Sequence, residues 1–259
     1  LKPAAKDFRI MWDNAYCVHD LTDTPDTLLD LYAECLKRGT EDQVLFFAST
    51  SKISFPGAGV AALAASKRNI EDLKRRITAQ TIGPDKLNQL RHILFLHDIN
   101  GVYDLMQGHR QILQPKFQIV EESLERELGN LGIAKWSKPN GGYFVNLDVM
   151  NGCAKRVVNL CKEAGVVLTD AGATFPYGAD PNDSNIRVAP TFPPQEELRQ
   201  AMHWLPVKNF WQTVPTLLAK EITKGCLLNG RQPFLGIRSI FPVCFHQGRQ
   251  GSRIAKGPV

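Results

Sequence analysis

The sequence lacks any apolar run long enough to cross a membrane as a helix. None of its 259 residues belongs to a stretch approaching about 18 consecutive apolar residues. Its start also lacks a charged segment followed by an apolar one, the pattern of a secretory signal peptide. Without these features, we expect the protein to be cytoplasmic.

The sequence also lacks a cysteine or histidine pattern that would hold a metal ion or a disulfide framework. It contains six cysteines and six histidines, and no two cysteines form a C-x-x-C pair. His92 and His97 are five positions apart, which does not place them on one helix face. We therefore expect reduced thiols and no metal site.

Acidic residues become scarce near the end of the chain. Residues 205–259, called the basic tail below, contain eight Lys or Arg and one acid, Glu221, which gives a net charge of +7. The whole chain carries +5, so residues 1–204 carry −2. Three interpretations stay open: sequence foreign to the preceding fold, such as a frameshifted or mispredicted end; a disordered basic extension; or a nucleic-acid patch, the least favoured.

The first part of the chain predicts a parallel α/β unit. Residues 7–12 and 43–48 have the apolar character of strands, and residues 26–38 between them have helical spacing. In parallel sheets, the chemistry lies beyond the carboxyl ends of the strands. Asp13 and Lys52 follow the two strands, so we expect both at that edge.

The remaining sequence predicts a change of architecture. We expect a small α+β domain over residues 116–204, after a first region over residues 1–115. Gly141-Gly142 is expected to allow close backbone packing at a strand start. The predicted helices are 60–79, 85–96, 109–131, 154–164 and 194–204, and the predicted strands are 141–147, 166–169 and 185–189.

Four sequence features together match the chemistry of pyridoxal phosphate. This cofactor needs a lysine for a Schiff base, a carboxylate for its pyridine nitrogen and a phenol near its ring oxygen. Short hydroxyl residues and backbone N–H groups can hold its phosphate, and arginine suits a substrate carboxylate. The features are Asp13-Asn14-Ala15-Tyr16, Ser49-Thr50-Ser51-Lys52, the glycines Gly57 and Gly59, and Arg187.

The chain resembles the fold-type-I pyridoxal-phosphate aminotransferases of class I/II. Within them it is most similar to the bacterial aspartate-aminotransferase-like subgroup. The Asp-x-Ala-Tyr box lies 39 residues before Lys52, and Arg187 lies 135 residues after it. The resemblance covers residues 1–204, with further matches at 138–144 and 171–178. It implies an α/β fold in which residues 1–115 form the C-terminal part of the large, mainly parallel cofactor domain.

The resemblance implies a role for each candidate residue. It makes Lys52 the Schiff-base lysine, which also carries a proton between the substrate Cα and the cofactor. It implies amino transfer from an amino acid, aspartate, to a 2-oxo acid, 2-oxoglutarate, by a homodimer. The other implied roles are Asp13 at the pyridine nitrogen, Tyr16 at the ring oxygen, Ser49 and Ser51 at the phosphate, and Arg187 at the substrate α-carboxylate.

The chain departs from the family pattern in two respects. Val60 stands where many relatives have a phosphate-binding arginine. In the family, about half of the protein precedes the Asp-x-Ala-Tyr box, so we expect a C-terminal portion that cannot complete the cofactor site alone. Two alternatives share the same residues: a pyridoxal-phosphate lyase or decarboxylase, and a non-enzymatic effector-sensing domain of a transcription regulator.

Overall fold

The computed structural model of the chain describes residue 5 and residues 7–204. The basic tail lies outside the described residues, so its three interpretations remain untested. The described residues group into one unit by their contacts, and the division expected at residue 115 stays a prediction. In the described part of the chain, no helix combines the length and apolar character needed to span a bilayer.

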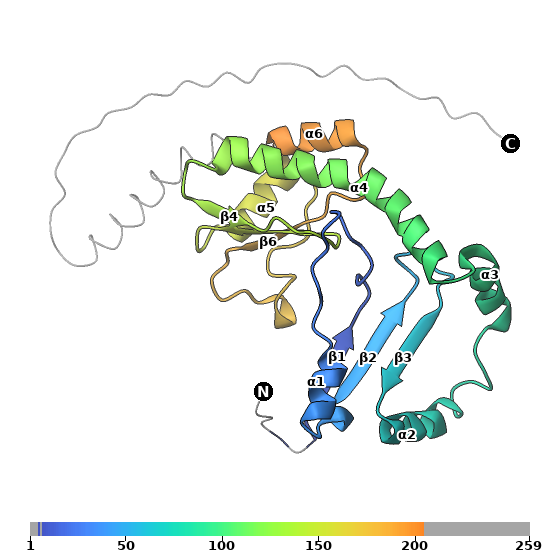
Figure 1. Ribbon diagram of the computed structural model, residues 1–259. Helices are drawn as coiled ribbons and strands as arrows, with labels where there is room; N and C mark the ends of the chain where they lie inside the picture. Colours follow the sequence, from blue (N-terminus) through green and yellow to red (C-terminus); the bar gives the residue numbers. More distant parts are fainter. Residues whose placement is uncertain (1–4, 6, 205–259) are drawn as a thin grey trace, which may run out of the picture. The chain divides into compact units, whose positions relative to one another are not determined.

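The first sheet has three strands in the order β1-β2-β3 (Figure 1). β1 (Ile10–Asp13) and β2 (Val44–Ser49) are parallel, with Ile10 opposite Val44 and Asp13 opposite Phe47. The predicted parallel pair is therefore confirmed. β3 (Ala61–Ala65) runs antiparallel to β2, which makes the described sheet mixed.

The predicted helix over residues 60–79 is wrong in its first part. Residues 61–65 form β3, and the helix α2 (Lys67–Ile77) begins only after Ser66. An alanine-rich run favours a helix by intrinsic propensity, but pairing with β2 overrides that preference. Ser66 marks the true start, because its hydroxyl accepts a hydrogen bond from the Asn69 N–H at 3.3 Å.

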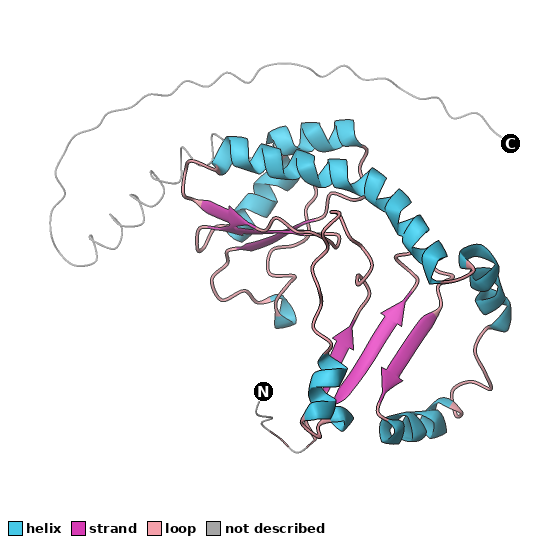
Figure 2. Cartoon of the chain, in the orientation of Figure 1, coloured by secondary structure: helices cyan, strands magenta, loops and turns pink. Residues whose placement is uncertain are grey.

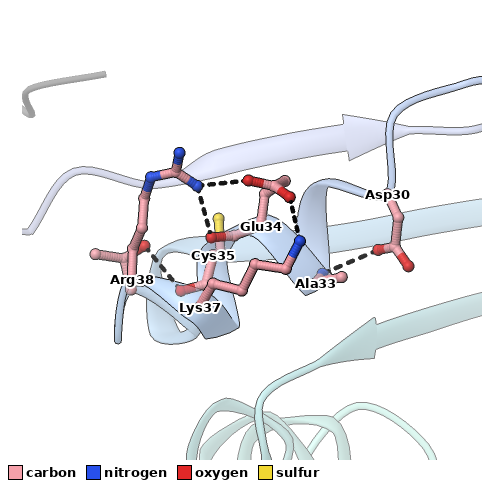
Figure 3. A network of polar contacts seen from close by, with 7 residues as sticks. Asp30, Ala33, Glu34, Cys35, Lys37 and Arg38 are labelled. Carbon is pink, nitrogen blue, oxygen red and sulfur yellow. Dashed lines mark hydrogen bonds and ion pairs between the residues drawn. The ribbon is translucent and has the colours of Figure 1, made fainter.

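The helix between β1 and β2 is shorter than predicted. α1 (Leu31–Lys37) begins after Asp30, whose carboxylate accepts a hydrogen bond from the Ala33 N–H at 2.9 Å. Glu34 binds Lys37 and Arg38, each at 2.7 Å (Figure 3). These two cations lower the pKa of Glu34 to about 2. A short 3-10 turn, η1 (Glu41–Gln43), leads into β2.

Two helices connect the sheets. α3 (Lys86–Leu96) confirms the prediction for residues 85–96. α4 (Ile99–Leu128) is longer than expected and starts ten residues before the predicted position 109. Gly101 and Gly108 obscure the helical pattern of its first turns, because glycine is a poor helix former. The buried face of its second half includes Leu113, Phe117, Val120, Leu124 and Leu128.

The second sheet contains β4 (Ala134–Trp136), β5 (Val145–Val149) and β6 (Asn185–Val188), and each strand is antiparallel to its neighbour in that order. Figure 2 shows the strands of the chain in magenta. Val145, Leu147 and Val149 turn one face of β5 into the core. β5 starts later than the predicted strand at 141–147. The predicted strand at 166–169 is wrong, because these residues pair with no strand, and β4 was not predicted.

The remaining helices agree with the sequence prediction. α5 (Ala154–Glu163) follows β5, and α6 (Gln195–Trp204) follows β6. α6 packs against α4, with Leu198 and Met202 buried (Figure 1). The short 3-10 turn η2 (Pro176–Gly178) lies between α5 and β6. The predicted α+β alternation is thus present in residues 134–204.

Candidate active site

Asp13 and Lys52 lie at the same edge of the first sheet. Asp13 is the last residue of β1, and Lys52 follows the end of β2 by three positions. The parallel ladder continues one step further, since the Asn14 N–H donates to the Phe47 carbonyl at 2.8 Å. Both side chains are exposed, and the Asp13 carboxylate accepts a hydrogen bond from the Ala15 N–H at 3.1 Å. Both residues therefore lie at the carboxyl edge of two adjacent parallel strands, where the sequence placed them.

Lys52 sits on a loop whose two ends are paired. The Thr50 N–H donates to the Val60 carbonyl, and the Val60 N–H donates to the Thr50 hydroxyl, both at 2.9 Å. The N–H groups of Ile53 and Ser54 then donate to the Thr50 carbonyl at 2.9 and 2.8 Å. The loop of residues 50–60 is therefore a closed turn, with Lys52 inside its first half.

A buried histidine that the sequence prediction missed holds this loop against α3. His92 Nδ1 lies 2.8 Å from the Asn88 carbonyl, and because a carbonyl only accepts, Nδ1 carries the hydrogen. Nε2 lies 3.0 Å from the Thr50 hydroxyl and 2.7 Å from the Ser54 hydroxyl. The Asn88 amide donates to the Ala58 carbonyl at 2.8 Å. The loop is thus anchored from one helix at both of its ends.

Ser49 and Ser51 form a small polar cluster beside Lys52. Their hydroxyls are 2.5 Å apart, and the Ser51 N–H donates to the Ser49 hydroxyl at 3.0 Å. Gly59 packs against this cluster: a Cβ on Gly59 would lie 3.1 Å from the Ser51 nitrogen. The glycine after the lysine therefore permits a close backbone approach. The backbone of Val60 closes the loop.

Tyr16 belongs to a group of rings that joins the segment after β1 to the segment before β5. Its ring centroid is 5.3 Å from that of His19, 5.1 Å from that of Tyr143 and 5.9 Å from that of Phe144. The contacts are edge-to-face or tilted, the favourable arrangement for aromatic pairs. Tyr16 is therefore fixed next to the segment that leads into β5.

His19 and Tyr143 both reach the backbone carbonyl of Lys52. His19 Nε2 and the Tyr143 hydroxyl are each 3.1 Å from the Lys52 carbonyl oxygen. Burial lowers the pKa of His19 and raises the pKa of Tyr143, so both are neutral near pH 7. Neither contact was predicted, although Tyr143 lies in the Gly-Gly-Tyr-Phe motif.

Arg187 lies on β6, with its guanidinium over the ring of Phe144. The Cζ atom is 4.5 Å from the ring centroid, within the range of a cation–π contact. Arg187 Nε is buried and has no hydrogen-bond partner among the described residues. Arg187 stands opposite Asn146 in the β5–β6 ladder. The ring group thus connects Arg187, through Phe144, with Tyr16.

A polar network supports the strand that carries Arg187. The amide nitrogen of the buried Asn185 donates to side-chain oxygens of Asn146 and Asp148, both at 2.6 Å. The Thr174 hydroxyl donates to the Asn185 amide oxygen at 2.5 Å. The loop before β6 and the strand β5 therefore hold Asn185 two positions before Arg187, which restrains the backbone at the arginine.

A polar hollow of about 530 Å³ lies at the other end of the first sheet. Its lining includes Arg9 and Gln43, which directly precede β1 and β2, and Arg68 and Arg75 of α2. None of the predicted site residues lines it. This hollow is therefore separate from the strand edge that carries Asp13 and Lys52.

Residues 1–209 match the protein family described as aspartate amino-transferase. The chain belongs to the aspartate aminotransferase family. A Mycolicibacterium smegmatis protein named as an aminotransferase is 52% identical, and an aspartate aminotransferase of Corynebacterium glutamicum is 44% identical. Each match covers 78% of this chain and 47% of the relative. The chain thus spans about half the length of the curated relatives it matches.

Solved aminotransferase structures align with about four fifths of the chain. An aspartate transaminase of Corynebacterium glutamicum aligns at a TM-score of 0.77 with 42% identity, covering 80% of this chain and 49% of that protein. LysN of Thermus thermophilus, an α-aminoadipate aminotransferase complexed with N-(5′-phosphopyridoxyl)-L-leucine, shares the fold at a TM-score of 0.64 and 20% identity, over 82% and 51% of the two chains. The resemblance to the fold-type-I, bacterial aspartate-aminotransferase-like subgroup is confirmed.

Proposed function

We propose that the protein carrying this chain is a pyridoxal-phosphate-dependent aminotransferase that moves the amino group of aspartate to 2-oxoglutarate. Lys52 is the residue that binds the cofactor covalently. One observation carries the proposal: in a member of the aspartate aminotransferase family, Asp13 ends β1 and Lys52 follows the adjacent parallel strand β2, at the carboxyl edge of one sheet. Ligand sites of α/β sheets occur at this edge.

The residues at this edge fit the chemistry of the cofactor. Bound pyridoxal phosphate supplies an electron-accepting ring that stabilises negative charge at the substrate Cα. The Asp13 carboxylate would keep the pyridine nitrogen protonated, and the Tyr16 hydroxyl would bind the ring oxygen. Ser49 and Ser51 share one hydroxyl–hydroxyl hydrogen bond, which leaves one of their two hydroxyl hydrogens to donate to a phosphate oxygen.

Lys52 has the surroundings that a covalent and proton-moving role requires. Its side chain is exposed, and no acidic side chain of the described residues forms an ion pair with it. Its loop is anchored by Thr50, Val60 and His92, so the backbone of the lysine is held while the amine moves. The free Lys52 amine would hold and move the proton at the substrate Cα.

Arg187 is the residue for the substrate α-carboxylate. Its planar guanidinium suits a bidentate pair with a carboxylate, and the contact with the Phe144 ring orients the guanidinium. Its buried Nε has no partner in the described part of the chain, so a carboxylate can supply one. Aspartate and 2-oxoglutarate both carry this carboxylate, so the same arginine serves both substrates. The family resemblance further implies a homodimer.

The test uses the full-length protein that carries this chain. We expect it to show the visible absorbance band of a lysine-bound cofactor and to transfer the amino group of aspartate to 2-oxoglutarate. Lys52→Ala loses both, whereas Lys162→Ala, a matched change at an exposed lysine of α5, keeps both.

Three other outcomes would contradict the proposal. A band that persists in Lys52→Ala rules out the lysine assignment. A lysine-dependent band without turnover on any amino donor favours effector sensing. Loss of carbon dioxide or of a substrate fragment, without amino transfer, favours a decarboxylase or a lyase.

A further inference from the structure

The backbone carbonyl of Lys52 accepts hydrogen bonds from two side chains that are distant in sequence. His19 follows β1 and precedes Lys52 by 33 positions, whereas Tyr143 precedes β5 and follows Lys52 by 91 positions. Both contacts measure 3.1 Å. The peptide group of the candidate cofactor lysine is therefore held by one residue from each sheet region.

The protonation of His19 follows from its partners. The Lys52 carbonyl can only accept, so His19 carries its hydrogen on Nε2. His19 Nδ1 is buried and has no partner among the described residues, and the whole side chain is only 2% exposed. A buried ring with one unpartnered nitrogen is best accommodated as the neutral form. His19 thus acts as a fixed hydrogen-bond donor.

The two donors are locked to each other through their backbones. The Gly142 N–H donates to the His19 carbonyl and the Leu21 N–H donates to the Asn140 carbonyl, both at 2.8 Å. Gly141 makes this approach possible, because a Cβ there would lie 2.8 Å from the His19 carbonyl oxygen. The rings of His19 and Tyr143 meet edge to face, with centroids 4.9 Å apart. Neither ring can turn away from Lys52 without disturbing the other.

We propose that His19 and Tyr143 are positioning residues for Lys52, which fix its peptide plane and thereby the direction from which its amine reaches the cofactor. This inference rests on the proposed function, because it gives the two contacts a purpose only if Lys52 binds the cofactor. Together with the turn hydrogen bonds of Ile53 and Ser54, the two bonds to the carbonyl restrict rotation about the Lys52 Cα–C bond, and thereby the direction of its Cα–Cβ bond. The flexible side chain then samples fewer positions away from the reacting carbon.

This arrangement makes Tyr143 a link between the second sheet and the lysine loop. Phe144, the next residue, contacts Arg187, while the Tyr143 hydroxyl contacts Lys52. Two consecutive residues of one segment thus contact the two proposed site residues: Phe144 contacts Arg187, and Tyr143 contacts Lys52. A displacement of that segment changes the surroundings of both.

The first experiment measures amide hydrogen exchange in the cofactor-free, full-length protein. In Tyr143→Phe and His19→Leu, we expect faster exchange at the Ile53 and Ser54 amides, which close the lysine turn. His19→Gln restores slow exchange, because its amide can donate to the carbonyl. Tyr103→Phe on α4 is the matched control and stays unchanged. Wild-type exchange in Tyr143→Phe and His19→Leu would overturn the inference.

The second experiment measures how tightly the same variants bind pyridoxal phosphate, from the absorbance band that depends on Lys52. Tyr143→Phe and His19→Leu each weaken binding by about threefold to tenfold, the effect of one hydrogen bond. They also shift the pH at which the band changes, whereas His19→Gln stays close to wild type. Unchanged binding and an unchanged band in Tyr143→Phe and His19→Leu would contradict the positioning role.

The two experiments separate this inference from the proposed function. If the wild-type band is absent or persists in Lys52→Ala, the proposed function fails, and the positioning role falls with it. If the band depends on Lys52 but Tyr143→Phe and His19→Leu match the wild type in both measurements, only the positioning role fails. Should His19→Leu not fold, Tyr143→Phe, which removes a single hydroxyl, still decides the outcome.

Discussion

The guanidinium of Arg187 lies on the face of the Phe144 ring, with Cζ 4.5 Å from the ring centroid. Arg187 lies on β6, and Phe144 is the residue directly before β5. The pair aligns a planar charged group beside the ring group that contains Tyr16. The proposed carboxylate anchor is therefore oriented by a neighbouring aromatic residue.

Replacing Phe144 with leucine should weaken substrate binding. The change keeps an apolar side chain but removes the ring face, which is worth about 0.5–1 kcal/mol to a partly exposed cation. We expect KM for the amino acid to rise by roughly twofold to fivefold, with a smaller change in kcat. Steady-state kinetics of the full-length protein measure this. The fully exposed Phe192→Leu serves as the control, and an unaltered KM in Phe144→Leu would refute the orienting role.

The two-glycine motif should be intolerant of a methyl group at its first position. In Gly141→Ala, the new Cβ would lie 2.8 Å from the His19 carbonyl oxygen, which the Gly142 N–H holds in place. We expect a loss of about 1–3 kcal/mol in the free energy of unfolding, measured by urea denaturation. Gly108→Ala is the matched comparison, because no atom lies within 4 Å of its Cβ in α4. Gly108→Ala should raise the free energy of unfolding by about 0.5–1 kcal/mol. Equal stabilities of the two variants would disprove this account.

His92 should stabilise the lysine loop. In His92→Leu, the hydroxyls of Thr50 and Ser54 lose a shared buried hydrogen-bond partner, which costs about 1–3 kcal/mol in the free energy of unfolding. Chemical denaturation measures the loss. Arg91→Leu, at the exposed neighbouring position of α3, should change stability by less than about 0.5 kcal/mol. A His92→Leu protein as stable as Arg91→Leu would show that the network contributes nothing.

The ion pairs of Glu34 should make stability depend on pH. Lys37 and Arg38 lower the pKa of Glu34 from 4.5 to about 2 in the folded protein. Because the pKa is lowered in the folded protein, the ion pairs make their full contribution to the free energy of unfolding above pH 4.5. This contribution is lost as the pH falls towards 2. The denaturation midpoint of the wild type should exceed that of Glu34→Gln near pH 6, and the difference should shrink on acidification. A difference that does not vary with pH between 6 and 2 would contradict this assignment.

The sequence allowed the parallel β1–β2 pair to be predicted because local patterns determine it. The apolar runs and the intervening helical spacing define a strand–helix–strand unit, and that unit places Asp13 and Lys52 at one edge. The helices α3, α5 and α6 were predictable for a similar reason, since their apolar spacing lies within one segment. β3 was not predictable in this way, because its alanines pair with a strand that is supplied by another segment.

The same distinction separates the predicted site residues from those that were missed. Asp13, Lys52 and Arg187 belong to motifs with a recognisable order and spacing. His19, Tyr143 and His92 act through contacts between segments that are 33 to 91 positions apart. Gly141-Gly142 was the available signal, because a glycine pair predicts a close backbone approach, and His19 provides the backbone that it meets. The partner of that approach could be identified only from the fold.

The most direct test of the central claim locates the cofactor on the chain. The full-length protein is loaded with pyridoxal phosphate, the lysine–cofactor bond is reduced with borohydride, and the modified lysine is identified by peptide mass spectrometry. We expect Lys52 to carry the reduced cofactor, and we expect no stoichiometric modification of any lysine in Lys52→Ala. Stoichiometric modification of another lysine, with Lys52 unmodified, would contradict that claim.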